Sequence, residues 1–371
     1  MTSNFSTEDR LAFLDSLRGI AAIWVVFYHV IYMPAPNLEA PEWARPWASI
    51  GGVGVTLFFL VSAFSLCYTM PFHAKAPQPL RSFYVRRLLR IAPLLYVMLA
   101  VTLVRDVVVW RATHSPADIA ENLLFVFNLV PGKQTGIVWA SWTIGVEMLF
   151  YLMFPVFYIW SRGIVRATIF FLGAVALALA FKRLLDYYSA GTSDFFQLSV
   201  IRHLPVFASG IVAFQFYERF ALGKNIVKSL ALFAVSLGLF VAAAMMLNLL
   251  FGDPYYFQIP WFVATLLGLA FFPFSFLVNR LTGFLGKLSY SLYLIHPPLV
   301  VALIPLYRRL YGWDMPLSAK YLMVVTLTFG LLILLAYPAY RYVEQPGIRL
   351  GKRLARRSRS PSISPAGAAA R

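Results

Sequence analysis

Long apolar stretches recur along the whole chain, and short polar segments separate them. A helix needs about 20 mainly apolar residues to cross the hydrocarbon core of a bilayer, because lipid offers no hydrogen-bond partners to unpaired backbone groups. Ten stretches are apolar and long enough, and each predicts a membrane-spanning helix. Their limits are residues 13–33, 51–70, 91–110, 142–160, 164–181, 203–217, 229–251, 259–278, 284–305 and 321–343.

Two segments of the chain do not fit this pattern. Residues 118–130 are apolar but too short to cross, and a length of about 13 residues favours an interfacial or re-entrant segment. Residues 357–371 are rich in Ser, Pro and Arg and have little to bury, so we expect them to be disordered. The sequence therefore predicts an all-α polytopic membrane protein, with one transmembrane domain over residues 1–350 and a disordered basic cytoplasmic tail over residues 351–371.

The composition excludes a soluble domain. Of the 371 residues, 60% are hydrophobic and 13% are charged, whereas soluble domains carry about 25% charged residues. The 32 Lys and Arg residues outnumber the 15 Asp and Glu residues, for a formal net charge of +17. Such a charge suits nucleic acid or an anionic membrane surface, but the apolar runs leave no solvated basic face for nucleic acid. We therefore expect the lipid bilayer as a partner and no nucleic acid.

The positions of the basic residues predict the orientation of the chain. With the N-terminus inside, 21 Lys and Arg residues fall in inner segments and nine in outer segments. Because cytoplasmic loops carry an excess of Lys and Arg, this asymmetry favours ten spans with both termini cytoplasmic. The polar N-terminal residues do not fit a cleavable signal peptide, so we expect the first span to stay in the protein. The single cysteine, Cys67, predicts a packing residue, with no internal disulfide and no cysteine metal site.

Ionisable side chains inside the predicted spans need an explanation, because each costs at least about 2.5–3.5 kcal/mol at a helix centre. Arg18 and His29 are eleven positions apart in the first span, which places them on one helix face about 16 Å apart along the axis. This face carries a cation near one end and an imidazole near the other, as a reaction site would. The alternative is that Asp15 pairs with Arg18 and that His29 only packs in the core.

Three arginines lie within about one helical turn just before the third span, at Arg86, Arg87 and Arg90. Guanidinium groups suit phosphates, and Arg87 and Arg90 face the same side of a helix, so the cluster is a candidate anion site. The alternative is ordinary anchoring to lipid headgroups, which a positively charged inner segment also predicts.

Two more ionisable residues lie in later spans. Glu147 enters the fourth span from the outer side, at a depth that we expect to match that of His29. His296 lies in the ninth span and precedes Pro297 and Pro298, which remove backbone donors and open space around the ring. Both residues are candidates for a site. Each also has a structural alternative, namely a hydrogen bond to a neighbouring helix for Glu147 and core packing for His296.

Together these segments resemble the acyltransferase 3 family of integral membrane acyltransferases, and the resemblance spans nearly the whole chain. Any one motif can arise in an unrelated membrane protein, but their shared order is specific. Two positions depart from the family pattern, because Ala63 stands where the family usually has Gly and Thr143 replaces the usual Ser. The matching segments are the arginine–ten residues–histidine motif from Arg18 to His29, FFLVSAF at 58–64, the Arg87 and Arg90 pair, SWTIGVEMLFYLMFP at 141–155, LGKLSYSLYLIHPP at 285–298 and EQP at 344–346.

The resemblance implies a reaction and a location. Members of the family transfer an acyl group, commonly acetyl, from a cytoplasmic acyl-CoA to a hydroxyl of a cell-surface or lipid-linked glycan. Acyl-CoA, most simply acetyl-CoA, is then the donor substrate, and we expect no metal. The resemblance also implies a stand-alone, multi-pass transferase of the bacterial cytoplasmic (inner) membrane, without the esterase-like domain that some members carry.

The resemblance also suggests roles for the polar residues. His29 is the predicted general base, since histidine suits proton transfer near neutral pH. Glu147 is predicted to orient the ring of His29, as the carboxylate of a hydrolase triad does, although a single sequence leaves open whether the two meet. The other candidates are predicted to bind the donor or another substrate, and they are Arg18, Arg86, Arg87, Arg90, Ser62, Trp142, Tyr290, Ser291 and His296.

Two other classes of function stay open. Ten spans with buried Arg, His and Glu residues also describe a secondary transporter or a flippase for an acylated or lipid-linked sugar, although the sequence has no internal repeat that we can detect. A catalytically inactive partner or sensor is a third interpretation, and the intact His29 and Glu147 speak against it.

Overall fold

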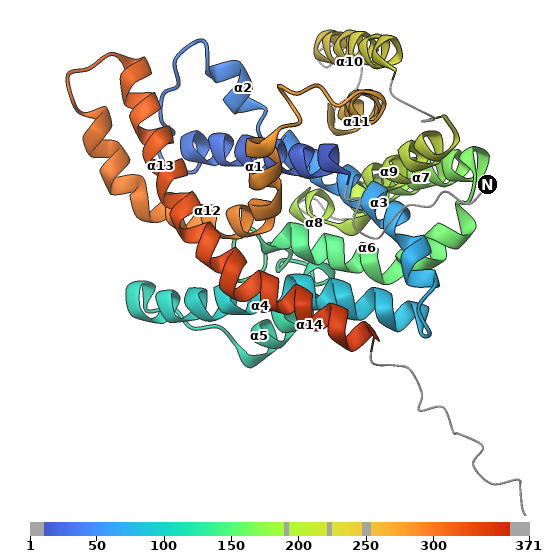
Figure 1. The fold of residues 1–371 in the computed structure, drawn as a ribbon. Helices are drawn as coiled ribbons and strands as arrows, with labels where there is room; N and C mark the ends of the chain where they lie inside the picture. The colour runs from blue at the N-terminus through green and yellow to red at the C-terminus, as the bar shows by residue number, and fades with distance from the viewer. Residues whose placement is uncertain (1–10, 189–192, 221–224, 247–253, 357–371) are drawn as a thin grey trace, which may run out of the picture.

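The computed structural model describes residues 11–188, 193–220, 225–246 and 254–356, and the regular secondary structure within them is helical (Figure 1). Eight helical segments are long and apolar enough to cross a membrane. The predicted all-α, multi-pass membrane fold is therefore confirmed. The segments are α1 (Ala12–Tyr32), α3 (Val53–Ala74), α4 (Pro79–Trp110), α6 (Ser141–Trp160), α7 (Ile164–Tyr188), α8 with α9 (Ser193–Gln197 and Val200–Phe220), α12 (Arg280–Tyr311), and α13 with α14 (Leu317–Ala339 and Gln345–Arg356).

Two of the ten predicted spans are shorter in the structure. The predicted spans 229–251 and 259–278 correspond to α10 (Ile226–Met246) and α11 (Gln258–Phe271). Within the described residues, the apolar stretch of each is shorter than those of the other eight helical segments. α11 ends early because Pro273 disfavours helical backbone at the residue before it, and that residue is extended. At the ten predicted positions the described part of the chain thus has eight long apolar helical segments and two with shorter apolar stretches, and the end of the predicted span 229–251 lies outside the described residues.

The segment between α4 and α6 contains no long apolar helix, as expected for residues 118–130. It forms α5 (Pro116–Leu123) and a 3-10 turn, η1 (Phe127–Leu129). Lys133 contacts the Asp118 carboxylate at 2.8 Å, and this hydrogen bond is the main reason why the pKa of Asp118 is lowered to about 2. The loop is therefore held by an ion pair at neutral pH. The remaining short elements are α2 (Arg45–Ser49) and η2 (Pro254–Phe257).

The C-terminal helix continues beyond residue 350, where the transmembrane domain was expected to end. α13 passes through a π-helical turn, Tyr340–Glu344, directly into α14. Residues 351–356, which were predicted to belong to the tail, are helical in the structure. The rest of the predicted tail, residues 357–371, lies outside the described residues.

α14 packs along α4, and Figure 1 shows the two helices side by side. Gly347, Gly351 and Ala355 are spaced four residues apart, so they lie on one face of α14, and small residues let two helix backbones approach closely. A Cβ atom at Gly347 would lie 2.3 Å from the Leu89 carbonyl oxygen. The close approach explains why the helix extends to Arg356, and it holds α14 beside the arginines of α4.

α1 and α12 pack against each other at a second close approach, although they lie far apart in the sequence. A Cβ atom at Gly19 would lie 2.6 Å from the Thr282 carbonyl oxygen, and one at Gly286 would lie 1.9 Å from the Asp15 carbonyl oxygen. Next to this contact, the Thr282 hydroxyl donates a hydrogen bond to Ser16 Oγ at 2.9 Å. Only glycine allows the two backbones to approach so closely. The contact fixes the register of the two helices.

We predict that Gly286→Ala destabilises the protein. The added methyl group would collide with the backbone of α1, and overpacking of this kind costs about 1–3 kcal/mol, occasionally more. The thermal stability of the detergent-solubilised protein is expected to fall. Gly283→Ala is the matched control, since a Cβ atom there meets nothing within 4 Å and alanine favours a helix more than glycine does. Equal stability of the two variants would contradict the proposed close contact.

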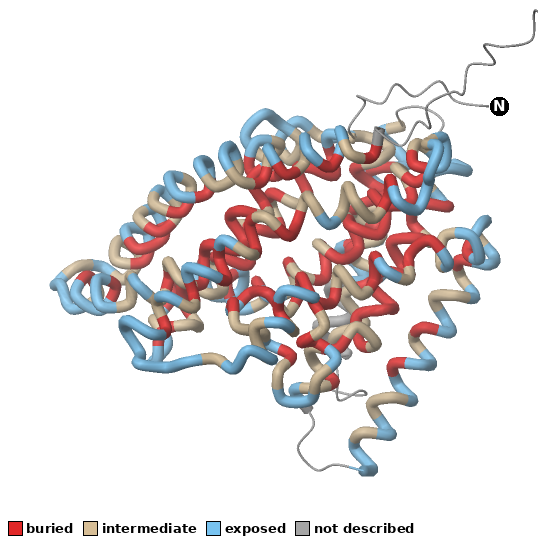
Figure 2. Tube along the Cα trace, turned by 90° about the horizontal axis from the view of Figure 1, so that it is seen from below, coloured by how far each residue is buried: buried red, intermediate tan, exposed pale blue. Residues whose placement is uncertain are grey.

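The outward faces of the bundle are apolar. Figure 2 shows buried residues on the inner sides of the helices and exposed residues on the outer sides. Val104 and Val108 of α4 and Val165 and Leu172 of α7 are large hydrophobic side chains that are more than half exposed. Such surfaces suit contact with lipid tails, which agrees with a helix bundle that lies within a bilayer.

Candidate active site

Three cavities lie between the helices and share lining residues. The basic cavity has a volume of about 650 Å³, the middle cavity about 80 Å³ and the histidine cavity about 370 Å³. Arg18, Arg87 and Arg90 line both the basic and the middle cavity, and Val55 and Tyr293 line both the middle and the histidine cavity. The cavities therefore follow one another in series, with the smallest between the two larger ones.

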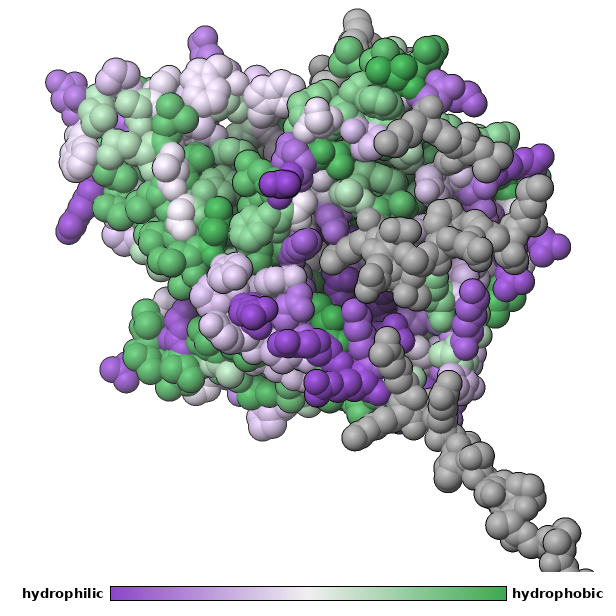
Figure 3. Space-filling model, viewed as in Figure 1, coloured by the Kyte–Doolittle hydropathy of each residue, from purple (hydrophilic) through white to green (hydrophobic). Residues whose placement is uncertain are grey.

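The basic cavity brings together the four arginines predicted to bind an anion. Arg18 comes from α1, and Arg86, Arg87 and Arg90 come from α4. On the face of the molecule in Figure 3, hydrophilic side chains gather over the region of α4 and α14, between surfaces that are largely apolar. The wall also carries other charged or titratable side chains, which are Asp15, His73, Lys287, Glu344 and Lys352.

Arg18 takes part in both of the arrangements that the sequence left open. It lies 3.5 Å from the Asp15 carboxylate, so the predicted local pair forms. It also donates a hydrogen bond from Nη2 to Ser65 Oγ of α3 at 2.9 Å, and it lines two cavities. Its side chain is only 12% exposed. The ion pair and the hydrogen bond thus hold a cation where the basic and the middle cavity meet.

Arg87 is held by few protein contacts. Its Nη2 donates to Thr69 Oγ1 at 3.0 Å, and its guanidinium carbon lies 5.9 Å and 5.7 Å from the ring centroids of Phe83 and Tyr151. Its Nε is buried and has no hydrogen-bond partner within the described residues. Buried polar groups nearly always have partners, and phosphate oxygens are the acceptors that a guanidinium group binds best.

Tyr290 and Ser291 occupy different positions in the site. The Tyr290 hydroxyl donates to the Ile91 carbonyl oxygen at 2.7 Å, and its side chain lines the middle cavity. Ser291 donates to Glu344 at 3.1 Å. Glu344 is 2% exposed, and the π-helical turn presents it to the basic cavity. Ser291 itself lines none of the three cavities, and Glu344 was not among the predicted site residues.

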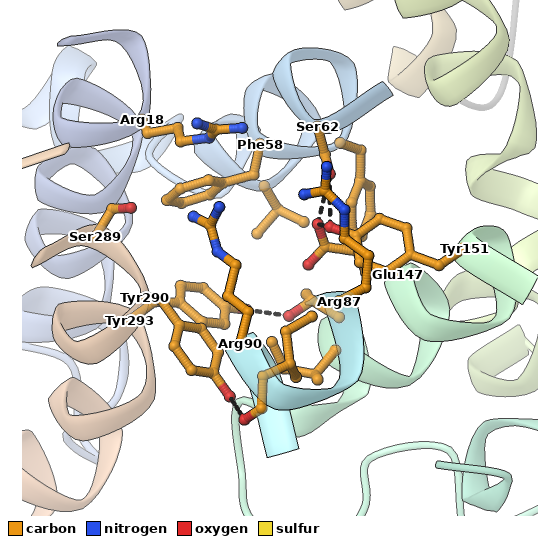
Figure 4. Close-up of a pocket in the computed structure, with 15 residues that line it drawn as sticks. Arg18, Phe58, Ser62, Arg87, Arg90, Glu147, Tyr151, Ser289, Tyr290 and Tyr293 are labelled. Atoms are coloured by element: carbon orange, nitrogen blue, oxygen red, sulfur yellow. Dashed lines mark hydrogen bonds between the residues drawn. The ribbon is translucent and has the colours of Figure 1, made fainter. Parts of the chain in front are cut away.

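The middle cavity contains a carboxylate with two hydroxyl partners. Ser62 Oγ of α3 donates to Glu147 Oε1 at 2.5 Å, and the Tyr151 hydroxyl donates to the same oxygen. In Figure 4, Glu147 and the guanidinium groups of Arg87 and Arg90 approach one another within this cavity. Glu147 has therefore found a partner on a neighbouring helix, which was its structural alternative.

The sequence left open whether Glu147 and His29 meet, and the structure places them apart. Glu147 lines the middle cavity and His29 lines the histidine cavity, and the hydrogen bonds of the described residues do not join them. The ring beside His29 belongs to His296, with the two ring centroids 4.9 Å apart. Sequence spacing could not reveal this neighbour, because the contact depends on the packing of α1 against α12.

The histidine cavity is walled by aromatic and polar side chains. His29, His296 and Trp142 of α6 all line it. The Trp142 ring centroid is 5.4 Å from that of His203 on α9, and His203 Nδ1 lies 2.5 Å from the Tyr255 hydroxyl. Aromatic surfaces beside hydrogen-bonding groups are typical of sites for small polar molecules.

Several residues that line the cavities were not predicted from the sequence. His203 could have been found, because it lies within the predicted span 203–217 and ionisable residues in spans are rare. Tyr151 carries no comparable signal, since tyrosine is common in apolar helices. Tyr255 joins the cavity only through the packing of the chain after α10 against α9. Residues such as Tyr151 and Tyr255 enter the lining of the cavities only through the packing of helices against one another.

The fold and cavities define an integral membrane protein whose polar site lies inside a helix bundle. The chain matches the family model described as the acyltransferase domain over residues 11–341. The protein therefore belongs to this acyltransferase family.

Characterised relatives point in the same direction. The chain is 24% identical over 371 aligned residues to the O-acetyltransferase OatA of Staphylococcus aureus strains NCTC 8325 / PS 47, COL and MRSA252. The alignment covers 90% of this chain and 56% of OatA, so the chain spans about half the length of these relatives. No solved structure matches the chain significantly.

Proposed function

We propose that the protein is an O-acyltransferase of the bacterial cytoplasmic membrane. It transfers an acyl group, acetyl in the simplest case, from a cytoplasmic acyl-CoA to a hydroxyl of a cell-surface or lipid-linked glycan. Family membership and the similarity to OatA support acyl transfer. The observation that carries the proposal is the series of three cavities, with clustered arginines at one end and histidines at the other.

The donor binds in the basic cavity. A CoA thioester carries phosphates, and Arg18, Arg86, Arg87 and Arg90 supply the guanidinium groups that suit them. The middle cavity, at about 80 Å³, has room for a slender chain and not for a nucleotide. The thioester arm therefore extends toward the histidine cavity while the nucleotide stays behind. The excess of basic residues in the predicted inner segments supports a cytoplasmic position for the donor.

His29 acts as the general base in the histidine cavity. Its imidazole accepts the proton of the acceptor hydroxyl as the oxygen attacks the thioester carbonyl carbon. The new C–O bond forms, the C–S bond breaks, and the departing thiolate takes the proton from the imidazolium. The Trp142 ring and the polar groups near it form the wall that the acceptor contacts.

Radiolabelled acetyl-CoA added to membranes that contain the protein distinguishes transfer from transport. We expect label on a glycan, covalently bound, in wild-type membranes and none in membranes that lack the protein. Mass spectrometry of surface glycans from a deletion strain then identifies the acyl group by the missing mass. Uptake of unmodified substrate without covalent labelling would support the transporter or flippase interpretation instead.

A further inference from the structure

His29 and His296 form a hydrogen-bonded pair of defined chemistry. His29 Nδ1 lies 2.8 Å from the Val25 carbonyl oxygen, and His296 Nδ1 lies 2.6 Å from the Tyr293 carbonyl oxygen. A carbonyl oxygen only accepts, so each Nδ1 carries the hydrogen. His296 Nε2 lies 3.3 Å from His29 Nδ1. Because His29 Nδ1 is already a donor, His296 Nε2 is the acceptor in this contact.

The tautomer of His29 also determines which of its nitrogens can act as a base. A neutral imidazole with hydrogen on Nδ1 has its lone pair on Nε2. His29 Nε2 has no hydrogen-bond partner within the described residues, and His29 lines the histidine cavity. The His29 side chain is therefore held in the tautomer in which Nε2 is available to a substrate hydroxyl.

We propose that His296 is a positioning residue for acyl transfer. Its Nε2 is a second acceptor for the hydrogen on His29 Nδ1, beside the Val25 carbonyl oxygen, and it stabilises the imidazolium that forms when His29 Nε2 takes a proton. His296 thereby takes the place that the sequence analysis gave to Glu147, as a neutral acceptor instead of a carboxylate. This inference rests on the proposed function of His29 as the base.

The surroundings of His296 hold its ring in one orientation. Its side chain is 1% exposed, so its orientation is determined by packing. The close approach of Gly19 and Gly286 brings α1 and α12 together, and each histidine lies ten residues after the glycine of its own helix. The contact that limits the separation of the two backbones therefore also sets the separation of the two rings.

Among the side chains around the pair, His296 is the one that accepts from His29 Nδ1, beside the backbone carbonyl of Val25. Tyr28 lies edge-on to His29, with centroids 5.1 Å apart, and Tyr293 lies 5.4 Å from His296. The further titratable or charged groups on the cavity wall are Arg202, His203 and Tyr255. Among the described residues, none of these side chains has a hydrogen bond to either ring.

The test replaces His296 with side chains that either keep or remove an acceptor for the hydrogen on His29 Nδ1. His296→Phe keeps a ring of similar size without nitrogen, and His296→Gln keeps an acceptor oxygen. We expect His296→Phe to lower kcat for acetyl transfer about 10- to 100-fold, the effect of one hydrogen bond to a charged group, with the KM for acetyl-CoA unchanged. His296→Gln is expected to restore kcat to within about threefold of wild type.

Tyr307→Phe is the matched control. This substitution also removes one buried hydrogen-bonding group from α12, namely the Tyr307 hydroxyl, which lies 2.6 Å from Thr328 Oγ1. Tyr307 lines none of the three cavities. The kcat of this variant should stay at the wild-type value. If His296→Phe does not insert into the membrane, His296→Met removes the acceptor with a more adaptable side chain and is measured in its place.

The outcomes separate this inference from the proposed function. Wild-type kcat in His296→Phe, or equal losses in His296→Phe and His296→Gln, would overturn the role of His296. If His29→Ala is inactive at the same time, the role of His29 as base survives. If His29→Ala is itself fully active, the proposed function of His29 fails, whatever the His296 variants show.

Discussion

His29→Ala is expected to lower kcat for acetyl transfer by about 100- to 10,000-fold, the usual contribution of a general base. The alanine variant has no group to accept the proton of the acceptor hydroxyl, so the oxygen attacks the thioester carbonyl poorly. The KM for acetyl-CoA should change little, because the donor phosphates bind in the basic cavity and not beside His29. Initial rates of labelled acetyl transfer in membranes, at saturating donor, measure both constants.

His114→Ala is the control for this experiment. His114 also forms a hydrogen bond, at 2.8 Å to Asp106, but it lines none of the three cavities. We expect wild-type transfer rates from this variant, after correction for the amount of inserted protein. Inserted His29→Ala protein that acetylates its glycan at the wild-type rate would contradict the role of His29.

The Arg87→Ala and Arg90→Ala variants are expected to raise the KM for acetyl-CoA by about 10- to 100-fold each, with smaller effects on kcat. Each substitution removes a guanidinium group from the basic cavity, and Arg87 has a buried Nε available for a ligand. Arg87→Lys should restore only part of the affinity, because an ammonium group lacks the planar fork that binds two oxygens. Steady-state kinetics over a range of acetyl-CoA concentrations provides the measurement.

Two comparisons separate phosphate binding from lipid anchoring. Arg81→Ala removes an exposed arginine at the start of the same helix, outside the basic cavity, and its KM should match wild type. Acetyl-dephospho-CoA lacks one phosphate, so an arginine variant that has lost the contact to that phosphate should lose less affinity for this donor than for acetyl-CoA. An equal rise in KM for Arg81→Ala would favour general anchoring to headgroups.

Hydropathy and helical spacing predicted the features that depend on one helix at a time. The eight long apolar helices follow from the local composition of each stretch and need no information about the other helices. Arg18 and His29 line the interior cavities, as their placement on one helix face predicted. α11 differed because one residue, Pro273, ends a helix that its apolar neighbours would otherwise continue.

Contacts between side chains of different helices could not be predicted from a single sequence. His296 meets His29 because Gly19 and Gly286 let α1 and α12 approach closely. Glu147 turns to Ser62 of α3, a partner far away in the sequence. These contacts follow from helix packing, and hydropathy carries no information about which helices become neighbours.

Near the C-terminal end, the spacing of small residues predicts the packing of α14. Gly347, Gly351 and Ala355 repeat every four residues, which is a packing pattern for close helices. The composition of the residues that follow, rich in Ser, Pro and Arg, predicted only a disordered tail. α14 instead follows α4, and Glu344 just before it reaches the basic cavity.

Labelling of oriented membrane vesicles tests the central claim, transfer from a cytoplasmic donor through the series of cavities. Labelled acetyl-CoA, which does not cross sealed membranes, is supplied to inverted and to right-side-out vesicles prepared from cells that contain the protein and its native glycans. We predict covalent glycan labelling in inverted vesicles, where the cytoplasmic face is accessible, and none in right-side-out vesicles or with His29→Ala. Equal labelling in right-side-out vesicles, or labelling that persists in His29→Ala, would contradict the account.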